Sequence, residues 1–160
     1  MNDIHLNVHG LGVFLYSPFA AETIAPHSNF LEQRFLTPEQ VLPFVYEGTL
    51  VAFQTGEGFF RLRFRQGYPA YPEEYLTYML RLAVLVKGGT LCFRDLSDLY
   101  DWNPQCSLEQ QLSLDDGYYH LSVCSNRDLS QDEIDILIYL NPLEEMPALD
   151  FRGNVPVLFG

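Results

Sequence analysis

After Phe59, the residues from 60 to 65 alternate strictly between apolar and charged side chains. The apolar positions after Phe59 are Phe60, Leu62 and Phe64, and the charged positions are Arg61, Arg63 and Arg65. Successive side chains of a strand point to opposite faces, so a period of two indicates a strand with one buried face. A helix would scatter these two kinds of side chain around its surface. The segment therefore predicts a sheet with a packed inner face.

Short apolar runs recur along the chain and are separated by glycine and proline. The 160 residues include 11 glycines and 10 prolines, which are spread evenly. Such punctuation is typical of an all-β domain. The expected strands are residues 13–16, 49–53, 59–65, 75–86, 90–93, 118–124 and 134–140, with a hairpin turn at Gly88-Gly89 and a strand end at Asn141-Pro142. We expect one domain over residues 1–160, an all-β, two-sheet antiparallel β-sandwich with little helix.

Helix signals are few. Thr37 and Pro38 suit the N-cap and first position of a helix, which Pro43 is expected to end within about a turn. Residues 107–112 could form one helical turn or a short strand.

Two stretches of the chain resemble each other. Residues 58–64 (GFFRLRF) and 117–123 (GYYHLSV) both begin at a glycine and continue as an aromatic strand. An acidic pair precedes the next apolar run in each case. This pattern predicts an internal repeat over residues of about 4–80 and 80–151, against the alternative of chance similarity between two β-meanders.

The charge of the chain is strongly negative. It has 21 acidic and 9 basic residues, a net charge of −12, with 13 acidic and 5 basic residues after Leu80 against 8 and 4 up to it. Nucleic acid and anionic lipid both require clustered lysine and arginine, so neither is an expected partner. Acidic surface accelerates association with a basic protein. The first hypothesis is therefore an acidic module that binds or inhibits a basic partner, as toxin-immunity proteins and nuclease inhibitors do.

Three acidic segments are the expected partner-binding sites. They comprise Asp95, Asp98, Asp101 and Trp102 in one loop, Asp115 and Asp116 in a second, and Asp132 and Glu133 in a third. Tyr68, Tyr71 and Tyr100 add loop aromatics of the kind found at interfaces. The alternative is a module that binds a small ligand or Ca²⁺, in which Asp95, Asp98 and Asp101 would be weak metal candidates lying close to the second loop.

The arginine face at Arg61, Arg63 and Arg65 has two interpretations. Guanidinium groups suit carboxylate or phosphate ligands, so the face could bind an anion. In so acidic a chain, these arginines could instead pair with carboxylates on neighbouring strands.

Other chemistry has little support in the sequence. The four histidines lack zinc-ligand spacing, and neither a nucleophile elbow nor a phosphate-binding glycine motif is present, so an enzyme is the third hypothesis and no cofactor is expected. Three cysteines without CxxC spacing and an N-terminus without a signal-like segment favour a cytoplasmic protein. We expect Cys92 and Cys124 to be buried, and nothing beside Cys106 in the sequence to lower its pKa.

Overall fold

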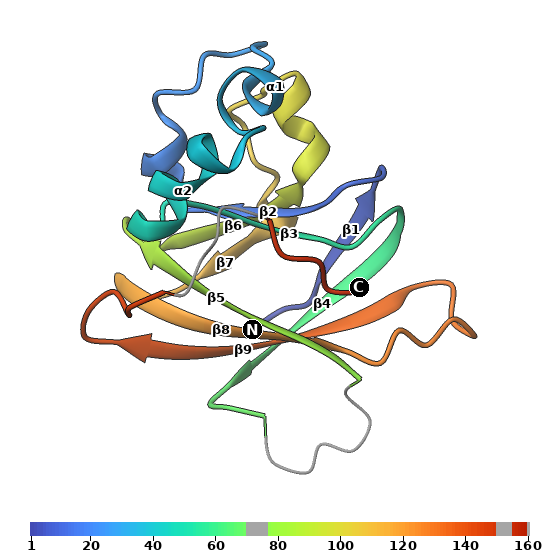
Figure 1. Cartoon of the computed structure of the whole chain (residues 1–160). Helices are drawn as coiled ribbons and strands as arrows, with labels where there is room; N and C mark the ends of the chain where they lie inside the picture. Colours follow the sequence, from blue (N-terminus) through green and yellow to red (C-terminus); the bar gives the residue numbers. More distant parts are fainter. Residues whose placement is uncertain (70–76, 150–154, 160) are drawn as a thin grey trace.

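Two sheets pack face to face in the computed structural model, which describes residues 1–69, 77–149 and 155–159 (Figure 1). The larger sheet has the strand order β1 (Ile4–Val8), β4 (Gly58–Gln66), β9 (Ile134–Leu143), β8 (Gly117–Ser125) and β5 (Tyr78–Val86). The smaller sheet has the order β3 (Leu50–Gln54), β2 (Gly12–Tyr16), β6 (Thr90–Asp95) and β7 (Gln111–Ser113). The expected two-sheet β-sandwich is confirmed.

The main core lies between the two sheets. On β4, Phe60, Leu62 and Phe64 are buried in this core, as the alternation predicted. The facing sheet contributes residues such as Val13, Leu15 and Phe93. The arginines of β4 consequently lie on the outer face of the five-stranded sheet.

The strand pairing departs from expectation at two places. Strand β4 pairs with β9 in parallel, whereas the other strand pairs of both sheets are antiparallel. Gly88-Gly89 connects β5 to β6, which belong to different sheets, so the prediction of a hairpin turn there is wrong. The physical reason is that β5 forms its ladder with β8, from Tyr78 opposite Ser125 to Val86 opposite Gly117.

A helical cap covers the outer face of the four-stranded sheet (Figure 1). It consists of η1 (Pro18–Ala21), α1 (Phe30–Arg34), α2 (Pro38–Glu47) and η2 (Leu96–Tyr100). A second apolar core fills the space beneath it, with Phe14, Leu50 and Leu99 among its buried members. The sheet is therefore buried on both faces, which explains why all five residues of β2 are inaccessible to solvent. Helix α1 was not expected from the sequence.

Helix α2 begins where expected and ends later than expected. Thr37 accepts a hydrogen bond from the Gln40 backbone and completes a capping box, while Pro38 occupies the first turn. The prediction that Pro43 ends the helix is wrong, because α2 continues to Glu47. Pro43 lies on the exposed side, where water can replace the hydrogen bond that proline cannot donate. The helix stops at Gly48, whose φ of +70° suits glycine.

The remaining expectations concern segment ends. Residues 107–112 form both alternatives in succession, because η3 (Leu108–Gln110) leads directly into β7. Strand β9 runs on to Leu143, past the expected end at Asn141-Pro142. Residues 75 and 76 of the strand expected over 75–86 lie outside the described residues.

The internal repeat remains a prediction. None of the helices in the described ranges is long and apolar enough to cross a membrane.

Candidate functional site

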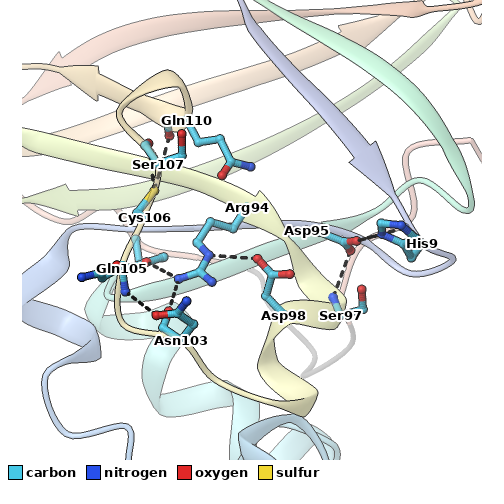
Figure 2. Close-up of polar contacts among 11 residues, drawn as sticks. His9, Arg94, Asp95, Ser97, Asp98, Asn103, Gln105, Cys106, Ser107 and Gln110 are labelled. Atoms are coloured by element: carbon cyan, nitrogen blue, oxygen red, sulfur yellow. Dashed lines mark hydrogen bonds and ion pairs between the residues drawn. The ribbon is translucent and has the colours of Figure 1, made fainter. Parts of the chain in front are cut away.

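Arg94 anchors the loop that follows β6. The residue is only 5% exposed, and its guanidinium donates from Nε to Asp98 at 2.9 Å and from Nη1 to the Asn103 carbonyl oxygen at 2.6 Å (Figure 2). A further bond of 3.2 Å reaches the hydroxyl of Tyr16 on β2. A buried charge requires such a set of partners, because an unpaired guanidinium in the interior would be very costly. The arginine thus joins the sheet to both ends of the 96–103 segment.

Trp102 completes this anchor from the other side. The Arg94 guanidinium lies 4.3 Å from the centre of its ring, a cation–π arrangement. The indole is fully buried and makes edge contacts with Phe14 and Tyr16. Its Nε1 is buried without a hydrogen-bond partner among the described residues. Trp102 therefore supports the loop from within and offers no surface to a partner, contrary to its expected role.

Asp95 also serves the structure of the loop. It caps η2 by accepting from the Ser97 backbone, and its other oxygen contacts His9 at both the backbone nitrogen and Nδ1 (Figure 2). The Asp95 side chain is almost fully buried, while the His9 ring is exposed. Asp95 thus fixes the start of η2 and ties it to the chain between β1 and β2.

The carboxylates of this loop differ in their burial and in the charged groups that they contact. Burial raises the pKa of Asp98 by more than Arg94 lowers it, although the side chain keeps 37% of its exposure. Asp101 is largely exposed and contacts Nδ1 of His27 at 3.2 Å. Tyr100 lies between them with 44% of its surface accessible. The surface that this loop presents therefore includes Asp98, Tyr100 and Asp101.

The helical cap extends this acidic surface. Helix α1, which carries Glu32 in its first turn, packs against η2. Over residues 17–48 the acidic residues outnumber the basic ones by four to one, and all four are exposed: Glu22, Glu32, Glu39 and Glu47. These glutamates are absent from the predicted site residues, because the cap that carries them was not predicted. The local charge balance of residues 17–48 is the signal that could have found them. We call residues 17–48 together with residues 96–101 the acidic cap.

The other two predicted acidic segments lie elsewhere. Asp115 and Asp116 precede β8, and Glu133 and Asp132 follow it, so the two pairs lie at opposite ends of that strand (Figure 1). The Asp116 carboxylate accepts from the Gly89 backbone at 2.8 Å, and Glu133 contacts His5 at 2.7 Å. The eight predicted residues therefore do not form one surface.

The arginines of β4 are largely paired. Arg61 donates two hydrogen bonds to Asp135, at 2.6 and 2.9 Å, from the register position directly opposite on β9. Arg63 lies 3.7 Å from Asp3 and 3.9 Å from the same Asp135. Arg65 donates to the Phe64 carbonyl oxygen. For Arg61 and Arg63 the structure favours pairing with neighbouring carboxylates over a bound anion.

The geometry of a metal site is missing from the described part of the chain. No group of three or more His, Cys, Asp or Glu side chains is arranged there to hold an ion. The Ca²⁺ alternative required the 95–101 loop to lie near Asp115 and Asp116. Asp116 is bonded to Gly89, just before β6, whereas Asp95 ends that strand, and five steps of a strand separate the two ends of β6 by roughly 16 Å.

A large apolar cavity opens between α2, β3, β5 and β8. Its volume is about 710 Å³, and Val41, Leu82 and His120 are among the residues that line it. Burial lowers the pKa of His120, and its Nδ1 has no hydrogen-bond partner among the described residues. Arg81 also lines the cavity, and the Tyr68 ring lies beside His120 with the two ring centroids 5.4 Å apart.

Comparison with known proteins identifies two solved structures with this architecture. One is described as crocagin biosynthetic gene J, with a TM-score of 0.58 and 16% identity over 88% of this chain and 95% of that chain. The other is ComJ from Bacillus subtilis, described as an inhibitor of the DNA-degrading activity of NucA, with a TM-score of 0.51 and 9% identity over 89% and 96%. No protein-family model and no curated protein sequence matches the chain. At these identities the likeness shows a shared fold.

Proposed function

We propose that this chain is a protein-binding inhibitory module that uses the acidic cap to bind a basic protein, with a nuclease as the favoured kind of target. The observation that carries the proposal is the separation of charge across the sandwich. The acidic cap lies over the outer face of the small sheet (Figure 1), whereas the burial pattern of β4 places Arg61, Arg63 and Arg65 on the outer face of the large one.

The fold comparison supports the nuclease as the target. ComJ, which shares this fold over most of both chains, is described as an inhibitor of a DNA-degrading activity. A nuclease must bind a polyanion, so the cleft that holds its substrate is generally lined with cations. An acidic protein surface can occupy such a cleft and exclude DNA by competition.

Within the acidic cap, we propose that η2 and α1 make the central contacts. Tyr100 offers an exposed aromatic ring and is followed in the chain by the exposed Asp101, and α1, which packs against η2, carries the exposed Glu32. Aromatic side chains surrounded by charged rims are typical of interface centres. The Arg94 and Trp102 anchor holds η2 in place before binding, which lowers the entropy lost on association.

The test is inhibition of a purified nuclease. Proteins retained from the source cell on the immobilised chain are purified and assayed on duplex DNA with increasing amounts of the chain, with DNA in excess. We expect a retained nuclease to be inhibited stoichiometrically, and the association rate to fall at least roughly tenfold between about 50 and 300 mM salt.

Charge reversal locates the surface. The double variant Glu32→Lys with Asp101→Lys is expected to slow association by roughly tenfold, because it places positive charge where the basic partner approaches. The matched control is Glu57→Lys, an exposed position in the β3–β4 turn outside the acidic cap. The proposal fails if no retained protein degrades nucleic acid, or if the double variant inhibits as well as the control.

A further inference from the structure

Two cysteines that are distant in sequence meet beneath the acidic cap. Cys92 lies on the outer side of β6, fully buried, and its cross-strand neighbour on β7 is Gln111. The side-chain amide of Gln111 donates to the Cys106 carbonyl oxygen at 2.9 Å, which places Cys106 beside the same position. The Cys106 thiol itself lies 3.6 Å from the Ser107 carbonyl oxygen and 4.0 Å from that of Gln110 (Figure 2).

Solvent can reach this pair. Both cysteines line a cavity of about 300 Å³ together with Tyr16, Trp102 and Gln111. Cys92 forms the buried wall of the cavity, whereas Cys106 is half-buried in the loop before η3. A small molecule that enters from solvent therefore meets the Cys106 sulfur first.

The surroundings of Cys106 favour its thiolate. The neighbouring Cys92 thiol and the Arg94 guanidinium lower the pKa of Cys106 by more than burial raises it. The neighbouring Cys106 and burial raise the pKa of Cys92, which therefore keeps its proton. The expectation that nothing lowers the pKa of Cys106 is thus wrong, because both groups reach it through the fold and neither adjoins it in sequence. Reactive cysteines are thiolates in partly exposed sites of this kind.

We propose that Cys106 and Cys92 form a reversible oxidation site that reacts with hydroperoxides and closes to an intramolecular disulfide. The Cys106 thiolate attacks the outer peroxide oxygen, so that an S–O bond forms, the O–O bond breaks and the alcohol or water leaves after taking a proton. The Cys92 sulfur then attacks the resulting sulfenic sulfur. The S–S bond forms, the S–O bond breaks, and the Cys92 proton leaves with hydroxide as water. The two thiols supply the two electrons that reduce the peroxide.

Cys124 provides an internal control. It is buried on β8, in the other sheet, and does not line the cavity that Cys92 and Cys106 share. Oxidation directed by this geometry should therefore spare Cys124, whereas non-specific oxidation of an unfolded chain would involve all three thiols.

The test is thiol mapping of the reduced full-length chain after treatment with hydrogen peroxide at equimolar to modest excess. We expect a Cys92–Cys106 linked peptide, a mass lower by two hydrogen atoms and full reversal by dithiothreitol, both in the wild type and in Cys124→Ser. In Cys92→Ser, the sulfenic acid at Cys106 should persist and be captured by dimedone, and Cys106→Ser should give neither product.

The wild-type map alone decides the proposal if a cysteine variant does not fold. Recovery of Cys92 and Cys106 in alkylated form after peroxide treatment would overturn it. So would disulfides that involve Cys124 or that join two chains in preference to the predicted pair.

Discussion

Replacement of Arg94 by methionine should destabilise the protein severely, since methionine keeps the apolar stem and removes the guanidinium. The cation–π contact with Trp102, at 4.3 Å in a desolvated site, contributes about 2 kcal/mol. The bonds to Tyr16 and to the Asn103 carbonyl oxygen contribute about 1 kcal/mol each. Asp98 adds little, because its side chain is 37% exposed and can be solvated when the arginine is gone. We expect the free energy of unfolding to fall by about 3–5 kcal/mol.

The assay is urea unfolding followed by tryptophan fluorescence. Trp102 is the one tryptophan of the chain and lies against the mutated side chain, so its emission reports on the cap directly. The matched control is Arg81→Met, at an exposed arginine, which should change the free energy of unfolding by less than about 0.5 kcal/mol. A loss below about 1 kcal/mol in Arg94→Met would refute the reasoning, because it would mean that the buried guanidinium anchors nothing.

Three further perturbations test separate features. Burial lowers the pKa of His120 below its ordinary value, so the unfolded chain binds the proton at a higher pH than the folded chain does. The free energy of unfolding should therefore fall as pH drops from about 6.5 to 5, and it should fall less in His120→Gln. Urea unfolding midpoints measure both changes. The hydrogen bond from Arg61 lowers the pKa of Asp135, so this carboxylate stabilises the fold above its unfolded pKa, and the contribution should fade as pH drops below about 4. In Asp135→Asn, the melting temperature should therefore fall less steeply with pH in this acid range. An unchanged dependence of the melting temperature on pH would contradict the pairing. Thr37→Ala removes the cap of α2 and should cost about 1 kcal/mol by urea unfolding, whereas Thr23→Ala, at an exposed position outside a helix, should cost almost nothing.

The local sequence pattern was sufficient to predict the core residues of a strand that buries only one of its two faces. The alternation on β4 predicted which side chains enter the core, because a period of two assigns each residue to a face whatever the strand pairs with. The start of α2 was also predictable from the local sequence, because Thr37 and Pro38 act on backbone groups within a few residues of themselves.

Local pattern failed where distant residues decide the outcome. Gly88-Gly89 has the composition of a hairpin turn, but β5 pairs with β8, so this turn connects β5 in one sheet to β6 in the other. Trp102 has the polar sequence neighbours of an exposed loop residue, but its indole packs against Arg94 within the second core and is buried. The parallel pairing of β4 and β9 has no local signal, because two strands far apart in sequence can meet in either direction.

The sequence by itself determined the sandwich class, the buried faces of its strands and the excess of acidic charge, since these follow from composition and from the two-residue period of a strand. The tertiary structure decided which of those charges share a surface. It separated the three predicted acidic segments, paired Arg61 and Arg63 of β4 with Asp135 and Asp3, and packed α1, which carries Glu32, against η2. It also placed Cys106 and Cys92 at one cavity. The physical reason is that charge pairing and thiol chemistry depend on distances of a few ångströms between side chains, and those distances are set by long-range packing rather than by position along the chain.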